Sequence, residues 1–179
     1  MTHDDVLAFW FEEINPKQWW VKDEAFDEDI RRRFLNLHQQ AHQCELFSWR
    51  ATAQGRLAEV IVLDQFSRNM YRDTAQAFAS DTLALALAQE AVLQGDDQAL
   101  SPSQRSFLYM PYMHSESLVV HEEAERLFAA LGNENTLEFE RRHKAIIEKY
   151  GRYPHRNYIL GRESSEQEIA FLEQPGSSF

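Results

Sequence analysis

The sequence contains a single cysteine and no long hydrophobic run. One thiol cannot form an internal disulfide, and no C-x-x-C pair is present, so Cys44 belongs to no disulfide framework and no cysteine-based metal or redox motif. No stretch approaches the roughly 18 consecutive apolar residues of a transmembrane helix. The first residues, MTHDDVLAFWFEE, are acidic where a signal peptide needs basic residues before an apolar stretch. These absences predict a cytoplasmic protein that does not span a membrane, and we expect no cofactor.

Positive charge is also scarce. The chain has 18 Lys and Arg residues against 29 Asp and Glu residues, a net charge of −11, and a pI near 5.1. Duplex nucleic acid and anionic membrane surfaces both require a cationic footprint, so neither is an expected partner. One segment departs from the average: residues 141–162 contain seven basic residues and only Glu148 as an acid, hence +6. A local site for a small anion remains open there.

Helical periodicity of three and four residues runs along almost the whole chain, whereas the alternating pattern of strands is almost absent. The 179 residues contain no long Gly, Ser or Pro tract and fit one domain over residues 1–179, with a tail at 175–179 that is expected to fray. The pattern predicts an all-α fold of seven to eight helices, arranged as antiparallel hairpins or a bundle. Capping residues place helix starts near Thr2, Asp23, Ser80, Ser101 and Ser165, and the apolar pattern places others near Arg56, Ser115 and Thr136.

A block of polar residues follows the apolar run LAEVIV in the helix expected over 56–72. Asp64, Arg68 and Arg72 recur at i, i+4 and i+8 and therefore share one stripe, with Gln65 and Asn69 in the neighbouring row. These side chains are either a solvated helix end or buried groups. Because a central helix must satisfy its polar groups internally, we expect Asp64 to be paired in the interior.

The segment FLYMPYMHSES supplies candidate partners. Pro111 is expected to interrupt a helix, and a new helix starting near His114–Ser117 would present free N–H groups able to hold an anion. His114 and Glu116 flank this start. Three interpretations stay open: helix capping, a proton-transfer pair, or two of three metal ligands.

The loop GRYPHRN, which follows a helix that Gly151 is expected to end, contains Arg152, His155, Arg156 and Asn157. Loops frequently carry function, so this loop is a candidate binding segment. The alternative is that its arginines cap carbonyl groups at helix C-termini. Of the other histidines, His143 lies on an apolar stripe and is expected in the core, whereas His121, followed by two glutamates, is expected to face solvent.

Three motifs in this order, LDQFSRNMYR, FLYMPYMHSES and GRYPHRN with LGR after it, together with Trp19-Trp20 and Trp49, resemble the uncharacterised family known as domain of unknown function 924. The resemblance spans nearly the whole chain. It implies an all-helical fold similar to tetratricopeptide-like α/α superhelices and implies no established reaction. The positions that match the family motifs are Asp64, Gln65, Arg68, Asn69, His114, Glu116, Arg156 and Asn157.

The residues support three classes of function. The first, which we favour from the sequence, is an internal cation-rich pocket that binds a small anion or a peptide carboxylate, since Arg grips such groups with two parallel hydrogen bonds. Its expected ligand-binding residues are Arg68, Asn69, Arg72, Arg156, Asn157 and Gln65. The second is a hydrolase-like enzyme with acid–base candidates His114, Glu116, Asp64 and His155. The third is a structural or adaptor protein that binds partners on its outer helical surface.

Overall fold

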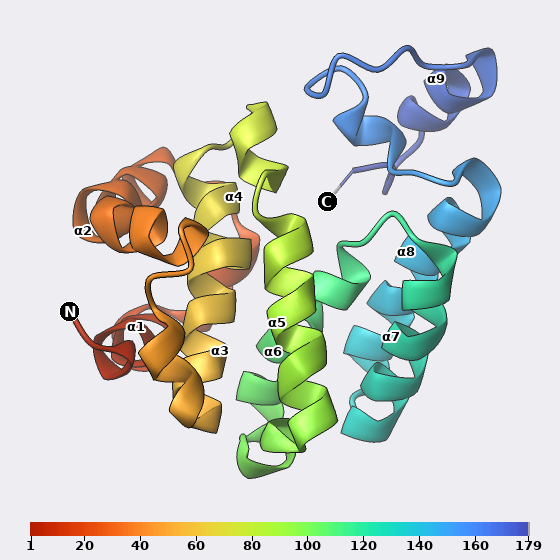
Figure 1. Cartoon of the computed structure of the whole chain (residues 1–179). Helices are drawn as coiled ribbons and strands as arrows, with labels where there is room; N and C mark the ends of the chain where they lie inside the picture. The colour runs from red at the N-terminus through yellow and green to blue at the C-terminus, as the bar shows by residue number, and fades with distance from the viewer. Residues whose placement is uncertain (179) are drawn as a thin grey trace. The chain divides into compact units, whose positions relative to one another are not determined.

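The computed structural model describes residues 1–178, and these residues form helices, turns and loops without any strand (Figure 1). The predicted all-α class is confirmed. The chain divides into two compact units: unit 1 comprises residues 1–72 and 76–111, and unit 2 comprises residues 73–75 and 112–178. Helix α6 (Pro102–Met113) crosses the boundary. With α3 and α4 taken as the single helix described below, eight helices lie within these residues.

Unit 1 begins with α1 (His3–Ala8), which continues as a π-helical turn over Phe9–Glu13. Thr2 and Asp5 form a capping box at its start, as Ser or Thr followed three residues later by an acceptor allows. Asp23 caps α2 (Glu24–His42), because its Oδ1 accepts hydrogen bonds from the first free N–H groups of that helix.

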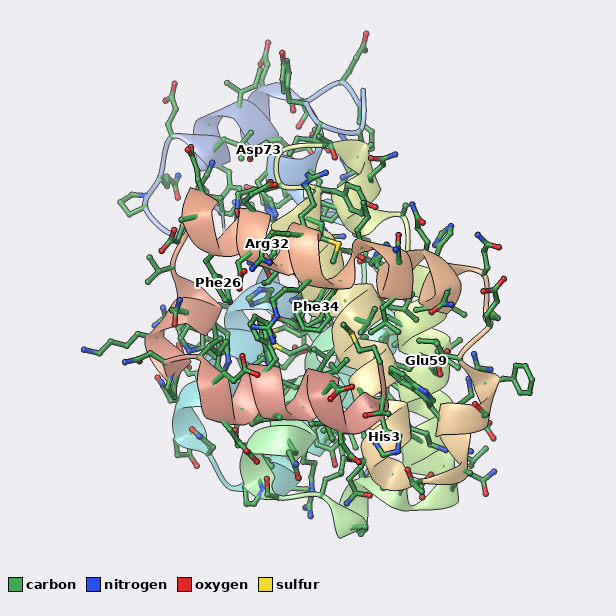
Figure 2. The ribbon with its side chains drawn as sticks, turned by 90° about the vertical axis from the view of Figure 1, so that its left-hand side faces the viewer. His3, Phe26, Arg32, Phe34, Glu59 and Asp73 are labelled. Carbon is green, nitrogen blue, oxygen red and sulfur yellow. The ribbon has the colours of Figure 1, made fainter. Side chains whose placement is uncertain are left out.

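The core of unit 1 is aromatic. Phe26 and Phe34 point inward from α2 (Figure 2), and Phe34 lies 4.9 Å from Phe9 and 4.7 Å from Phe66, measured between ring centroids. Trp10 packs edge-on against Phe66 and is 1% exposed. Buried aromatic rings supply much of the apolar area that stabilises a small unit.

The central helix of unit 1 consists of α3 (Ala53–Ile61), a π-helical turn over Val62–Phe66, and α4 (Ser67–Met70). It starts earlier than predicted, because Thr52 caps it through a hydrogen bond from Gly55 N, and it ends before Arg72. The run Leu57–Phe66 is buried almost throughout. The polar block therefore continues a helix that has no solvent-facing side in this stretch.

Two helix boundaries differ from the sequence prediction. Pro111 lies inside α6 and does not end it, because a proline removes one N–H donor but the remaining bonds of the helix persist to Met113. The following helix, α7 (Leu118–Leu131), starts after Ser117, so the stretch His114–Ser117 is a connection and not a helix start.

Ser80 precedes α5 (Asp81–Gln94) without capping it, because its hydroxyl lies 3.0 Å from His42 Nδ1 instead.

Unit 2 is built on the hairpin of α7 and α8 (Glu134–Tyr150), which lie side by side in Figure 1. Gly132 ends α7 with φ of 75°, a left-handed conformation that glycine adopts without strain. A short turn over Pro154–Arg156 and the helix α9 (Glu166–Leu172) complete the unit. In the segment expected to fray, the Ser177 hydroxyl donates to Leu172 O, and residue 179 lies outside the described residues.

Candidate functional site

The arginine stripe of unit 1 pairs with carboxylates of the same chain. Arg68 donates from both terminal nitrogens to the two oxygens of Asp81, at 2.9 and 3.0 Å. Its Nη1 also lies 3.1 Å from Asp64 Oδ1. This fork-to-fork geometry is the strongest form of arginine–carboxylate contact.

The second arginine of the stripe has a partner on α2. Arg72 donates from Nε and Nη2 to Asp27, at 2.5 and 2.8 Å, and Asn69 Nδ2 donates to the same carboxylate at 2.7 Å. Three hydrogen bonds thus converge on one acid that is 45 residues away from Arg72 in sequence. The contact ties α2 to the end of the central helix.

Asp64 is fully buried, which confirms its expected interior pairing. Gln65 Nε2 donates to Asp64 Oδ2, so both carboxylate oxygens have partners. A general acid or base must reach a substrate proton. Asp64 has no exposed surface through which it could do so.

In unit 2, the two other motif segments contact each other at the C-terminal end of α6. Three successive carbonyl groups in and after α6 accept side-chain hydrogen bonds. Tyr153 O–H donates to Met113 O, Arg156 Nη2 donates to His114 O at 3.0 Å, and His121 Nε2 lies 2.8 Å from Ser115 O. The last carbonyls of a helix lack partners within it, and these side chains supply them. Arg156 thus caps a helix end, the structural alternative left open by the sequence.

Glu116 also contacts the loop that carries Tyr153, through both of its carboxylate oxygens. Its Oε1 accepts a hydrogen bond from Tyr153 N at 2.7 Å, and both of its oxygens accept from Arg162, at 2.7 and 2.8 Å. Burial raises the pKa of Glu116, but the hydrogen bonds from Arg162 and Tyr153 outweigh burial and hold the pKa below its usual range. Glu116 is therefore an ionised structural acceptor.

Asn157 links the loop to α9. Its oxygen accepts from Arg162 Nε at 3.0 Å, and its amide nitrogen donates to Ser164 and Glu168, at 3.0 and 3.3 Å. Arg152 donates from Nε and Nη2 to the two oxygens of Glu168, at 2.7 Å for each bond. These bonds, together with those from Ser165 N–H and Asn157, lower the pKa of Glu168 to about 2. The basic segment 141–162 is therefore paired with acids that lie outside it in sequence.

The predicted site residues form two groups. Asp64, Gln65, Arg68, Asn69 and Arg72 lie in unit 1, around the carboxylates of Asp81 and Asp27. His114, Glu116, His155, Arg156 and Asn157 lie in unit 2, around the ring and backbone of Tyr153 or on its loop. The guanidinium of Arg156 lies 4.7 Å from the centroid of the Tyr153 ring.

Buried histidines are a feature of both units. Burial lowers the pKa of His143 to about 3 and that of His38 to about 4. Both imidazoles are therefore neutral at pH 7. His143 Nδ1 lies 2.7 Å from Phe139 O, and its ring lies edge-on to that of Tyr153, which confirms a place in the core.

His121 was wrongly expected to face solvent. It is fully buried between α7 and α8, with Nδ1 2.7 Å from the equally buried Glu140 Oε1. The two glutamates that follow His121 are not on its face of the helix, because successive residues are separated by about 100°. The spacing His121, Ala124 and Phe128 is the apolar stripe that would have placed His121 inside.

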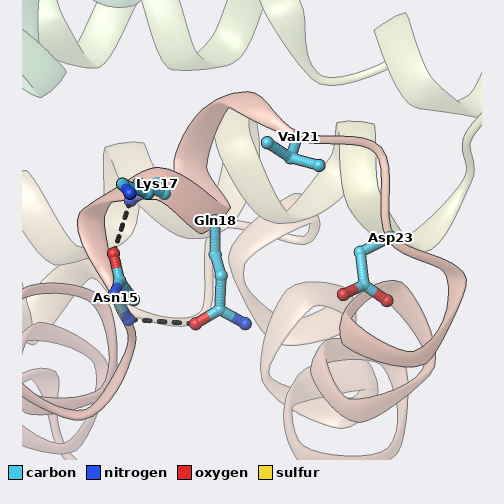
Figure 3. A pocket seen from close by; sticks show the side chains of 5 residues that line it. All are labelled: Asn15, Lys17, Gln18, Val21 and Asp23. Atoms are coloured by element: carbon cyan, nitrogen blue, oxygen red, sulfur yellow. Dashed lines mark hydrogen bonds between the residues drawn. The ribbon is translucent and has the colours of Figure 1, made fainter.

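An open hollow of about 310 Å³ lies elsewhere in unit 1, at the short helix Pro16–Trp20 (Figure 3). It is lined by Asn15, Lys17, Gln18, Val21 and Asp23. None of the predicted site residues lines it. Within residues 1–178, no cluster of three His, Cys, Asp or Glu residues is arranged to hold a metal ion, and no helix is long and apolar enough to cross a membrane.

The fold and these contacts define a class: an all-α protein whose polar motifs bind its own helices and loops together. Residues 6–176 match the model of a family described as bacterial protein of unknown function (DUF924), and the chain belongs to this family. It is 40% identical to ATU0120 of Agrobacterium tumefaciens, a protein of unknown function; its solved structure matches with a TM-score of 0.91 over 96% of each chain. No curated protein matches this chain.

Proposed function

We propose that this chain is an adaptor that binds a partner protein on its outer helical surface and has no catalytic role. The observation that carries the proposal is the engagement of the motif arginines by internal acceptors: Arg68 by Asp81 and Asp64, and Arg72 by Asp27. A ligand anion would have to displace these carboxylates. We also propose a cytoplasmic location, which the lone Cys44 supports.

The surface best suited to a partner lies around Trp20. Its side chain is 63% exposed, its ring stacks on Phe107 with an interplanar angle of 13°, and Val21 beside it is 57% exposed. Trp19 is held underneath by a hydrogen bond from its indole N–H to Trp10 O. A rigid, exposed tryptophan beside a hollow is the usual anchor of a protein interface. We propose that an aliphatic or aromatic side chain of a partner segment occupies this hollow.

Panning a random peptide library against the protein tests this surface. Peptides enriched on the wild type are expected to carry an apolar anchor and to lose at least about tenfold in affinity for Trp20→Ala, the ~1.4 kcal/mol or more that truncating an anchor costs. Phe47→Ala is the matched control, because Phe47 is 69% exposed in the same unit and does not line the hollow. Enriched peptides that bind both variants as well as the wild type would contradict the proposal.

A second candidate is the anion or peptide-carboxylate site expected from the sequence, restricted to unit 2. The observation that favours it is the burial of the Arg156 guanidinium, which is 6% exposed and belongs to the same loop as His155 and Asn157. A guanidinium can donate two parallel hydrogen bonds to a carboxylate or phosphate, and this one belongs to a loop that also carries an imidazole and an amide. This candidate requires an anion-dependent rise in melting temperature that Arg156→Gln abolishes. The structure gives no support to the acid–base alternative with His114, Glu116, Asp64 and His155. Both carboxylate oxygens of Glu116 and of Asp64 already have partners within the chain.

A further inference from the structure

The contact between His121 and Glu140 has a defined hydrogen-bond pattern. His121 Nε2 lies 2.8 Å from Ser115 O, and a carbonyl oxygen can only accept. Nε2 therefore carries a hydrogen and donates it. Tyr153 Oη, 3.1 Å from the same nitrogen, donates its own hydrogen to Met113 O and can share the Nε2 hydrogen as a second acceptor.

This assignment fixes the protonation of the whole pair. A ring protonated at Nε2 and otherwise neutral accepts at Nδ1, so Glu140 must then be the protonated acid that donates. A ring protonated at both nitrogens donates from Nδ1, and Glu140 is then a carboxylate. Both descriptions contain one proton between Nδ1 and Oε1, which are 2.7 Å apart.

The surroundings favour keeping this proton. His121 and Glu140 are each 0% exposed, and Glu140 Oε2 has no hydrogen-bond partner among residues 1–178. A bare carboxylate there would be costly, because an unpaired buried charge loses its hydration without compensation. Burial raises the pKa of Glu140, and the contact with His121 offsets that rise only in part.

We propose that His121 and Glu140 form a buried one-proton site, and that this proton fastens the Tyr153 loop to the C-terminal end of α6. Removal of the proton at alkaline pH leaves Nδ1 and Oε1 as two acceptors facing each other at 2.7 Å. The ring must turn or withdraw, and the hydrogen bond from Nε2 to Ser115 O is lost with it. Tyr153 Oη shares the Nε2 hydrogen, so the loop also loses its hydrogen bond to His121.

The sign of the pH dependence follows from proton counting. Above pH ~6.5 the unfolded chain holds no proton on either group, since free His and Glu have pKa values of about 6.5 and 4.3, whereas the folded pair holds one. Stability therefore falls as pH rises above ~6.5. Between about pH 4.5 and 6.5 the unfolded histidine also binds one proton, and the contribution of the pair is constant.

Glu125 and Lys144 are the charged groups that act on Glu140 besides His121. Glu125 of α7 and Lys144 of α8 form an ion pair at 2.8 Å, which lowers the pKa of Glu125 and raises that of Lys144, so both stay charged. His143, with a pKa of about 3, stays neutral. His114 and His155 interact electrostatically with His143 and are present in every variant compared below.

The test is the melting temperature of wild type, Glu140→Gln and Glu138→Gln between pH 6.5 and 9. The glutamine amide at 140 donates to Nδ1 in place of the proton and cannot titrate. The wild type and the control, whose Glu138 is exposed on the same helix, are expected to lose about 3–5 °C per pH unit more than Glu140→Gln. Equal slopes in all three proteins would overturn the proposal.

Hydrogen exchange and ¹⁵N NMR test the same site in the wild type and do not depend on the folding of a variant. The amide of Tyr153, bound to Glu116 Oε1, is expected to lose protection between pH 7 and 9 after correction for intrinsic exchange. The ¹⁵N shifts of His121 are expected to show a hydrogen on Nε2, the nitrogen that faces Ser115 O. An unprotonated Nε2, or a Tyr153 amide whose protection is unchanged to pH 9, would overturn the assignment.

Discussion

Replacing Arg50 with methionine is expected to lower the free energy of unfolding by about 3–5 kcal/mol. Arg50, in the short helix Phe47–Ala51, donates from Nε and Nη2 to the two oxygens of Glu59, each at 2.7 Å. Glu59 lies on α3 and is 0% exposed. Loss of the guanidinium leaves a buried carboxylate without its partner, which costs far more than the loss of a surface ion pair. Urea unfolding followed by circular dichroism measures the change.

Two further variants separate the stranded charge from general damage. Arg142→Met removes an exposed i,i+4 pair with Glu138 and is expected to cost no more than about 0.5 kcal/mol. Arg50→Met combined with Glu59→Leu removes both charges and is expected to recover most of the lost stability, as apolar replacements of buried pairs do. A cost for Arg50→Met as small as that for Arg142→Met would show that Glu59 is solvated.

Gly55→Ala is expected to destabilise the protein by about 3 kcal/mol or more, although alanine favours helix over glycine by about 1 kcal/mol. A Cβ at Gly55 would lie 2.0 Å from the backbone oxygen of Trp49. Backbone cannot rotate out of the way as a flexible side chain can. The start of α3 would therefore move away from the turn before it, with loss of the Thr52 cap and of the fit between Arg50 and Glu59.

Gly132→Ala is the matched control for this substitution. Gly132 has φ of 75°, and a Cβ added there would meet no atom within 4 Å, so alanine meets conformational strain alone, about 1–2 kcal/mol. Thermal unfolding of both variants under the same conditions gives the comparison. An increase in stability for Gly55→Ala, or equal losses at the two glycines, would contradict the close approach of the backbone at Trp49.

Local signals predicted the helices well because caps act over three or four residues. Asp23 and the Ser165–Glu168 box start helices as expected, and Gly151 ends one. Pro111 was assigned wrongly, because the sequence reports the missing donor but not the packing that keeps α6 intact around it. The π-helical turn over Val62–Phe66 has no cue in a pattern of three and four.

The polar groups could be identified from the sequence but their partners could not. Arg72 pairs with Asp27, 45 residues away in sequence, and Arg162 pairs with Glu116, 46 residues away. Contacts at such sequence separations are set by the tertiary fold and not by local pattern. The +6 of residues 141–162 suggested unneutralised cations, yet acids outside the segment pair with several of its residues, including Arg152 and Lys144. The net charge of a sequence segment does not show which acids from other segments pair with it in the fold.

The central claim, that internal carboxylates and carbonyls already engage the motif arginines, is tested most directly by one series of melting temperatures. The wild type is measured in chloride and in phosphate, sulfate or acetate at constant ionic strength, beside Arg156→Gln, Arg68→Gln and the exposed control Arg142→Gln. We predict the same response to each salt in all four proteins, because sulfate and phosphate stabilise any fold by exclusion from its surface. Arg68→Gln is expected to be less stable throughout, because Asp81 and Asp64 lose their partner. An anion bound at 100 times its Kd would add about 2.7 kcal/mol. A saturable rise of several degrees that Arg142→Gln retains and Arg156→Gln or Arg68→Gln lacks would contradict the claim.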